Sequence, residues 1–141
     1  MSEKLYTASV TSTGGGRDGH VVSTDGQIDF DVRPPKELGG SGEGVNPETL
    51  FAAAWAACFN GALQKTMKEA GVSVADHAPT VTAEVDLNKV SDGFRLSGSI
   101  FVAFADQDAM EDPAGLVQKA HEFCPYSRAV RGDFDATAGL K

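Results

Sequence analysis

The chain has few cysteines and no long apolar stretch. Its 141 residues include only 2 cysteines, too few for the disulfide framework that holds a small secreted protein together. No apolar run approaches the ~18 residues of a membrane-spanning helix, and the opening residues MSEKLYTASV lack the apolar core of a signal peptide. We therefore expect a cytoplasmic protein with no membrane partner, in which a permanent disulfide is not favoured.

Positive charge is also scarce. The chain has 12 Lys and Arg against 20 Asp and Glu, for a formal net charge of −8, and no block of like charges stands out. Binding to the phosphates of nucleic acid requires clustered Lys and Arg, and so does binding to an anionic membrane surface. The composition therefore predicts no nucleic-acid partner, and the hydrophobic fraction of 41% is that of an ordinary globular domain.

The first third of the chain has the two-residue alternation of half-buried strands. Segments 6–10 and 27–32 alternate apolar and polar residues, and the short run HVVS at 20–23 lies between them. The string GGGRDG at 14–19 predicts a hairpin turn or a loop, because so many glycines disfavour a helix. We expect three strands in this part of the chain.

A long glycine- and proline-rich loop, residues 34–46, leads into the main predicted helix. Asn46 is a typical N-cap, Pro47 suits the first helical position, and Glu48 places an acid in the first turn. The helix is expected to run to about Ala70 and to stop at the glycine that follows. Its interior, LFAAAWAACFNGAL, is apolar on nearly all sides, which predicts burial on most faces.

The rest of the chain adds a hairpin and a second helix. Apolar residues alternate over 81–87 and again over 94–104, on either side of an SDG turn. A second helix is expected from Asp112, its N-cap, to Cys124, where the following proline ends it. A short helical turn and a last strand at 133–138 complete a single α+β domain over the whole chain.

The two cysteines have different surroundings. Cys58 lies mid-helix among apolar neighbours, beyond the reach of the helix dipole, and burial raises the pKa of a thiol. By itself it is an inert core residue. To react it needs a cation, since a guanidinium at ~4 Å contributes about 4 kcal/mol at an effective dielectric of ~20, or roughly three pKa units. Composition does not choose among the five arginines: Arg17, Arg33, Arg95, Arg128 and Arg131.

Cys124, at a helix end beside a loop, is expected to be open to a partner. A transient, catalytic disulfide fits the cytosol better than a permanent one. His121 lies three residues before Cys124 on the same helical face, but with Cys58 it gives an incomplete set of metal ligands. Neither cysteine belongs to a CxxC pair, so we expect no metal site.

Three strings together resemble one protein family. GGRDGHV, GGSGEGVNPETLFAAAWAACF and CPYSRAVRG, in this order, are similar to the organic hydroperoxide resistance (Ohr) branch of the Ohr/OsmC proteins, from about Tyr6 to Ala138. The resemblance implies an OsmC-like fold, with antiparallel sheets and a long buried central helix, in an intertwined homodimer. It also implies a peroxidase without a cofactor, which reduces organic and fatty-acid hydroperoxides to alcohols and is recycled by the dithiol of a lipoylated protein.

The resemblance assigns roles to individual residues. Cys58 is matched to the peroxidatic cysteine and Cys124 to the resolving thiol. Arg17 of GGRDG and Glu48 of NPE are matched to the pair that lies beside the reactive thiol. Trp55 departs from the family, in which tyrosine is common near this position.

The spacing of Glu48 and Cys58 bears on the expected homodimer. The two are ten residues apart, which is ~15 Å along one straight helix at 1.5 Å per residue. An antiparallel copy of the helix in a second subunit would bring them together and would cover more of an all-round apolar helix. Without the resemblance, Glu48 is a dipole partner in the first turn and Arg17 a solvated loop charge.

Six side chains are candidates for the apolar wall of a pocket for lipid-like peroxides, and each of them equally suits a plain core: Phe51, Trp55, Phe59, Met67, Phe123 and Tyr126. Two other functions stay open. One is a redox-sensing or lipid-binding module without turnover, and the other is the broader OsmC branch with a different peroxide preference. Repeated turnover with a dithiol separates an enzyme from a sensor, and CPYSRAVRG favours the Ohr branch by resemblance.

Overall fold

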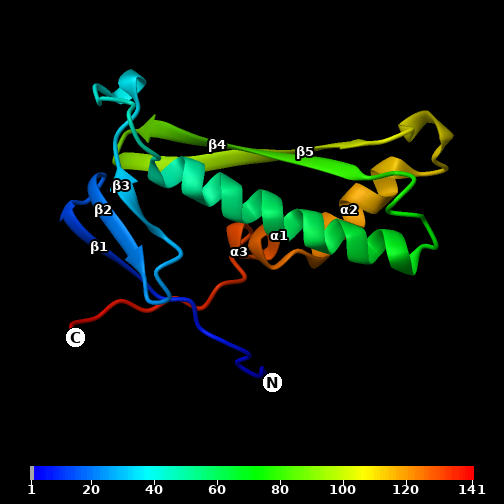
Figure 1. The fold of residues 1–141 in the computed structure, drawn as a ribbon, viewed down its shortest axis with the longest axis horizontal. Helices are drawn as coiled ribbons and strands as arrows, with labels where there is room; N and C mark the ends of the chain where they lie inside the picture. Colours follow the sequence, from blue (N-terminus) through cyan, green and yellow to red (C-terminus); the bar gives the residue numbers. More distant parts are fainter. Residues whose placement is uncertain (1) are drawn as a thin grey trace. The chain divides into compact units, whose positions relative to one another are not determined.

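The computed structural model describes residues 2–141 as a mixed α/β protein with two antiparallel sheets and three α-helices (Figure 1). The chain forms two compact units, an N-terminal unit that ends at Leu50 and a C-terminal unit, Phe51–Lys141. The expected α+β class is confirmed. Over the described residues, no helix is both long enough and apolar enough to span a membrane.

The N-terminal unit is a three-stranded antiparallel sheet in the order β1-β2-β3, formed by β1 (Val10–Gly15), β2 (Asp18–Ser23) and β3 (Asp29–Val32). A two-residue turn joins β1 to β2, and its first residue, Gly16, has φ +69°, a conformation that favours glycine. The expected hairpin is therefore confirmed.

The predicted strand at 6–10 is wrong for all but its last residue. β2 ends at Ser23, which lies opposite Val10, so the residues before Val10 have no β2 backbone left to form a ladder with. One further hydrogen bond, from Thr24 N to Ser9 O at 3.1 Å, does not extend the strand. Alternation alone did not reveal where the partner strand stops.

The expected loop over 34–46 is present and contains a short 3-10 helix, η1 (Lys36–Leu38). Its end returns to the sheet, because Val45 forms a parallel bridge with Val32 and its carbonyl accepts a 2.8 Å hydrogen bond from Arg33 N. This contact fixes the start of the following helix beside β3.

The helix α1 (Pro47–Glu69) begins and ends close to where its caps predicted. Asn46 Oδ1 accepts a hydrogen bond from Thr49 N at 2.9 Å, and Gly71, beyond the end, has φ +72°. The expected burial on most faces is not confirmed in the single chain. The buried residues, Trp55, Phe59, Ala62, Leu63, Thr66 and Met67, share one face, whereas Ala53, Ala57 and Gly61 are exposed.

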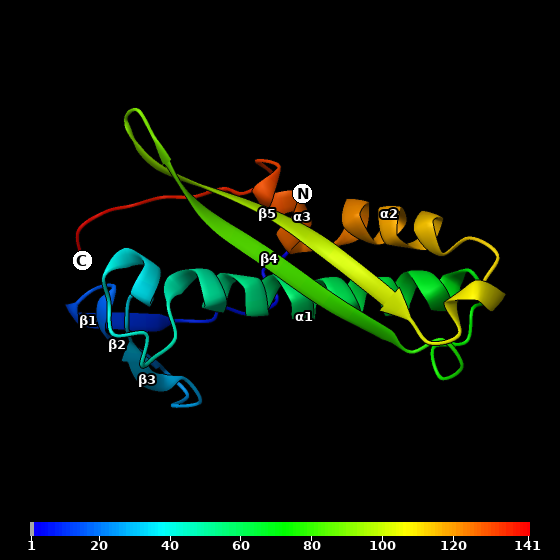
Figure 2. The ribbon, with the colours of Figure 1, turned by 90° about the horizontal axis from the view of Figure 1, so that it is seen from above.

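The C-terminal unit places a long hairpin against α1. The strands β4 (Pro79–Val90) and β5 (Gly93–Phe104) are antiparallel and cross α1 diagonally (Figure 2). The predicted alternation is confirmed in β4, where the apolar side chains are partly buried. In β5 it holds only from Ile100 onward, because the residues near the turn, Phe94 among them, are exposed.

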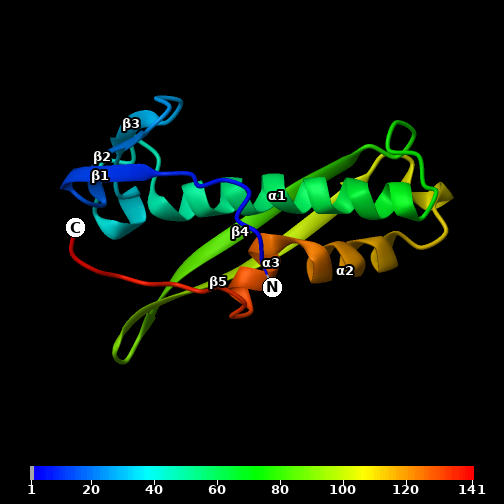
Figure 3. The ribbon, with the colours of Figure 1, turned by 90° about the horizontal axis from the view of Figure 1, so that it is seen from below.

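Two helices complete the C-terminal unit. Figures 2 and 3 show α2 (Pro113–Phe123) running alongside α1, with the short α3 (Pro125–Val130) after it. Asp112 caps α2 as predicted, since its carboxylate accepts a 3.0 Å hydrogen bond from Gly115 N. Leu116 and Ala120 pack into the core with α1. A second 3-10 helix, η2 (Gln107–Ala109), precedes α2.

The predicted last strand at 133–138 is wrong. After α3 the chain has no regular element, and these residues are exposed. A strand forms only when its backbone finds a partner and one of its faces is covered. Neither condition is visible in the local pattern of apolar residues.

Candidate active site

An arginine–glutamate pair lies within the N-terminal unit. Arg17, in the β1–β2 turn, donates from Nη1 to Glu48 Oε2 at 3.1 Å and from Nη2 to Glu48 Oε1 at 2.7 Å. The two parallel hydrogen bonds match the planar guanidinium to the carboxylate and fix its orientation. The side chain of Glu48 is 13% exposed and that of Arg17 is 48% exposed, so the guanidinium keeps access to other groups.

The charges of this pair stabilise one another. The hydrogen bonds from Arg17 hold the pKa of Glu48 below its ordinary value, and burial opposes this shift only in part. The same contact raises the pKa of Arg17. Both groups are therefore ionised throughout the neutral pH range.

The two thiols lie together in the C-terminal unit, both reduced. Cys124 has no exposed surface, whereas Cys58 is partly exposed. The expectation that Cys124 is the open thiol is wrong, because the corner between α2 and α3 packs directly into the core. The mid-helix cysteine is the one that a small molecule in solvent can reach.

Burial and two neighbouring residues set the acidity of Cys58. Burial has the largest effect and raises the pKa of its thiol. The nearby backbone N–H of Tyr126 lowers this pKa, whereas Cys124 raises it, both through its polar side chain and through its charge. None of these influences is a positive charge, so within the described chain the sum leaves Cys58 a thiol of low acidity.

A buried hydrogen bond joins the helices that carry the two thiols. Trp55 Nε1 donates to Ser127 Oγ at 3.0 Å, and both residues are buried. Trp55 lies one helical turn before Cys58, and Ser127 lies three residues after Cys124. Sequence reasoning missed Ser127, although a buried tryptophan N–H regularly requires a partner and so gave a signal to look for one.

The predicted pocket residues divide into two groups. Phe51 and Trp55 meet edge to face, with ring centroids 6.5 Å apart, and line a cavity of about 350 Å³ together with β4, β5 and Val130 of α3. A second cavity of about 390 Å³ is lined by Trp55, Phe59, β5 and α2. Phe59 and Met67 have no exposed surface and belong to the core, and Phe59 also borders this second cavity.

The other two candidates lie at the surface. Phe123 is 49% exposed, and Lys65 Nζ lies 4.3 Å from the centroid of its ring. Tyr126 is 43% exposed. Of the six candidates, Phe51 and Trp55 therefore best suit the wall of a pocket.

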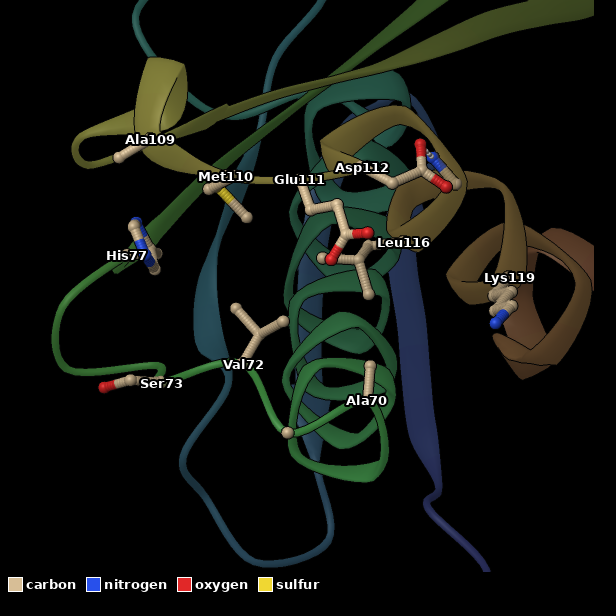
Figure 4. A pocket seen from close by; sticks show the side chains of 12 residues that line it. Ala70, Val72, Ser73, His77, Ala109, Met110, Glu111, Asp112, Leu116 and Lys119 are labelled. Carbon is tan, nitrogen blue, oxygen red and sulfur yellow. Dashed lines mark hydrogen bonds between the residues drawn. The ribbon is translucent and has the colours of Figure 1, made fainter.

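A further cavity, of about 400 Å³, lies at the C-terminal end of α1 (Figure 4). Figure 4 shows Val72, Met110 and Leu116 around it, with His77 at its edge. Two of its polar side chains have structural partners, since His77 Nδ1 lies 2.9 Å from Ala105 O and Asp112 caps α2. Neither cysteine lines this cavity.

His121 is partly buried, and burial lowers the pKa of its imidazole. Its ring lies 6.5 Å from that of Phe59, and its backbone carbonyl accepts a 2.9 Å hydrogen bond from Arg131. Among residues 2–141, no group of three or more His, Cys, Asp or Glu has the arrangement of a metal site.

Comparison with known proteins gives consistent matches over most of the chain. The family model described as OsmC-like protein matches residues 40–137. The organic hydroperoxide resistance protein OhrB of Bacillus subtilis (strain 168) is 44% identical over 139 residues, 97% of this chain and 98% of that protein. The organic hydroperoxide resistance protein of Xanthomonas axonopodis pv. citri is 40% identical, over 96% of this chain and 94% of that one. A crystal structure of such a protein from Legionella pneumophila has a TM-score of 0.81 at 40% identity, covering 92% of this chain and 93% of that chain.

Proposed function

The chain belongs to the family of OsmC-like proteins, among relatives named organic hydroperoxide resistance proteins, and we propose that it is a thiol-dependent peroxidase that reduces organic hydroperoxides to alcohols. The observation that carries this proposal is the contact between a partly exposed thiol and a buried one. Cys58 is open to a small oxidant and packs against the buried core cluster that contains Cys124.

The first step is attack of the Cys58 thiolate on the terminal oxygen of the hydroperoxide. The O–O bond breaks, the sulfur gains an S–O bond and becomes a sulfenic acid, and the leaving alkoxide takes up a proton to give the alcohol. The sulfur loses two electrons and the peroxide gains them. A hydrogen-bond donor at the sulfur, such as the Tyr126 N–H, favours the thiolate that this step requires.

The second step closes a disulfide. The Cys124 thiol attacks the sulfenic sulfur, an S–S bond forms, and the oxygen leaves as water. Because Cys124 already contacts Cys58, this step needs little rearrangement and competes with overoxidation. An external dithiol, such as that of a lipoylated protein, then reduces the disulfide by thiol–disulfide exchange and is itself oxidised to a disulfide.

A homodimer is part of the proposal. Cys58 requires a cation, and the Arg17–Glu48 pair presents an oriented guanidinium. Glu48 and Cys58 are ten positions apart on one helix, so in the proposed dimer this pair would instead reach the Cys58 of a second subunit, on an antiparallel copy of α1. There the guanidinium would stabilise the thiolate and the developing alkoxide.

Two features of the single chain support a second copy. In the middle of α1 the exposed residues are small, Ala53, Ala57 and Gly61, and they permit close approach of another helix. In addition, β4 and β5 form a sheet of two strands, and such a sheet is seldom stable without further cover.

The substrate of the proposed enzyme is an apolar hydroperoxide. Phe51 and Trp55 line a cavity beside the helix face that carries Cys58, and an apolar wall favours an alkyl or fatty-acyl chain over hydrogen peroxide. The formal net charge of −8 disfavours binding to nucleic acid and other anionic polymers. We place the proposed enzyme in the cytoplasm, where dithiol reductants are available.

The test is steady-state consumption of tert-butyl and fatty-acid hydroperoxides with dihydrolipoamide as the reductant. Wild type should turn over many times and prefer both organic peroxides to hydrogen peroxide. Cys58→Ser should consume none while keeping its fold. A single turnover in wild type would indicate a redox sensor, and undiminished consumption by Cys58→Ser would exclude Cys58 as the reacting thiol.

A further inference from the structure

One hydrogen bond and one close approach join α1 to α3. On α1, Trp55 and Cys58 are three residues apart and so lie on one face of the helix, a turn from each other. On α3, the residues that face them, Tyr126 and Ser127, are consecutive. The indole N–H of Trp55 donates to Ser127 Oγ at 3.0 Å, and the backbone N–H of Tyr126 lies near enough to Cys58 to lower the pKa of its thiol. Both therefore depend on a single register of α3 along α1.

The indole of Trp55 is held from its other side by β5. A Cβ atom added to Gly98 would lie 2.8 Å from Trp55 Cζ3 and 2.6 Å from the carbonyl oxygen of Glu84, so only glycine fits between them. The ring is thereby fixed against β5 with its N–H directed at α3. Trp55 is 5% exposed and Ser127 is fully buried, so water does not compete for this hydrogen bond.

The short helix α3 has little of its own to fix its position. It contains six residues, and its N-cap, Cys124, makes no capping hydrogen bond with its side chain. A helix of this length is not stable by itself, so tertiary contacts determine where it lies. The hydrogen bond from Trp55 to Ser127 is a tertiary contact with a fixed direction, and it lies beside the thiols.

We propose that Trp55 and Ser127 are positioning residues, whose hydrogen bond fixes α3 against α1 and so holds the Tyr126 N–H at Cys58 and the Cys124 thiol beside it. The assignment rests on the proposed function, in which Cys58 is the reacting thiol. Ser127 acts through Tyr126 and Cys124. It should therefore affect both the acidity of Cys58 and the rate of disulfide closure, although it forms no bond in either step.

The experiment compares Trp55→Phe, Ser127→Ala and the double variant with wild type. The first readout is the pH dependence of Cys58 alkylation by iodoacetamide, located by peptide mass spectrometry. The second is the rate of Cys58–Cys124 disulfide formation with diamide, which accepts two electrons and two protons from the two thiols. Phe104→Leu, a core truncation at the end of β5, controls for lost stability, and Ser127→Thr keeps the acceptor oxygen.

We expect Trp55→Phe and Ser127→Ala each to raise the midpoint of alkylation by about one pH unit, which is about tenfold in thiolate at fixed pH. Disulfide closure should slow about tenfold, and the double variant should be no worse than either single one, because both remove the same bond. Phe104→Leu and Ser127→Thr should each keep the wild-type alkylation profile and closure rate.

Wild-type profiles in both single variants would overturn the proposal, and so would an equal shift in Phe104→Leu or additive effects in the double variant. Neither readout requires peroxide turnover. A wild-type protein that fails to consume hydroperoxide would therefore refute the proposed function and leave the positioning roles of Trp55 and Ser127 open to the same measurement.

Discussion

A thiolate, not a thiol, attacks a peroxide, so the acidity of Cys58 decides its reactivity. Within one chain, burial raises the pKa of this thiol and the Tyr126 N–H lowers it. A neutral N–H donor carries only a partial positive charge. It therefore stabilises a thiolate less than a full positive charge at a similar distance does. The guanidinium of Arg17, held by Glu48, is the charge that the proposed homodimer brings to the sulfur.

Arg17→Ala should raise the pKa of Cys58 and reduce peroxidase turnover by about 100-fold, the usual cost of losing one donor at a developing oxyanion. The pH profile of Cys58 alkylation measures the first effect and steady-state kinetics the second. Arg17→Lys is the matched control, because it keeps the charge and loses the two-pronged contact with Glu48. An unchanged alkylation profile in Arg17→Ala would remove the arginine from the mechanism.

The same pair predicts a small effect on stability at low pH. The pKa of Glu48 is lowered in the folded state, so its contribution is present above the unfolded value and is lost as the pH falls through the lowered one. Arg17→Ala lacks this contribution, so its stability should decline less steeply than that of wild type over that acid range. Urea unfolding at a series of acid pH values measures both slopes.

At the scale of elements, the sheet of the N-terminal unit has a histidine between two carboxylates. His20 on β2 contacts Asp31 through Nδ1 at 2.8 Å and Asp29 through Nε2 at 2.6 Å, both on β3. Arg33 also faces this group, 3.2 Å from Asp31 and 3.6 Å from Asp18. The hydrogen bonds to Asp31 and Asp29 raise the pKa of His20, so protonated His20 bridges the two acids across the β2–β3 pair.

His20→Gln should remove a pH dependence from the stability of this sheet. Because the folded pKa is raised, the contribution of His20 is full below its unfolded value of ~6.5 and is lost as the pH rises through the folded value. Wild type should therefore lose more stability than the variant as the pH rises from about 6 through the folded pKa of His20. NMR titration of the His20 ring gives the folded pKa directly, and a value at or below the ordinary one would contradict this account.

Helix ends were the most predictable part of the fold, and strand ends the least. Asn46 and Asp112 act through hydrogen bonds to residues three positions away, and Pro125 acts on the residue just before it, so the sequence shows cause and partner together. The strands expected at 6–10 and 133–138 required partners that the local pattern does not contain. A two-residue alternation gives the side that a strand would bury, but not whether a neighbouring strand is present.

The candidate site was predictable only in part for the same reason. The resemblance to a family named both cysteines, Arg17 and Glu48, but the expected exposure of Cys124 was wrong, because burial at the α2–α3 corner depends on how that corner packs. The hydrogen bond between Trp55 and Ser127 joins residues far apart in the chain. Only the register of α3 along α1 brings them together.

At the scale of the whole molecule, the proposed assembly is a homodimer in which each active site draws on both subunits. The long helix α1 buries one face in the chain and leaves Ala53, Ala57 and Gly61 exposed. Small side chains lose little conformational entropy on packing, and they allow two helices to approach closely. This face is where we expect the antiparallel copy of α1 to lie.

Ala57→Arg should weaken the dimer, because it places a long charged side chain where two helices pack. Light scattering after size-exclusion chromatography should show wild type as a dimer and the variant shifted toward monomer, with turnover lost in parallel. Ala70→Arg, at an exposed position beyond the end of α1, is the matched control and should remain dimeric. A monomeric, fully active wild type would show that one chain suffices for the site.

The proposed mechanism depends on peroxide oxidising Cys58 and on Cys124 closing the disulfide. The most direct measurement is the mass of the reduced protein after one equivalent of cumene hydroperoxide and trapping of the remaining thiols. Wild type should lose two hydrogens and yield a linked pair of peptides containing Cys58 and Cys124, and Cys124→Ser should instead carry one added oxygen on Cys58. Two free thiols in peroxide-treated wild type, or an oxygen added elsewhere with Cys58 still reduced, would contradict the account.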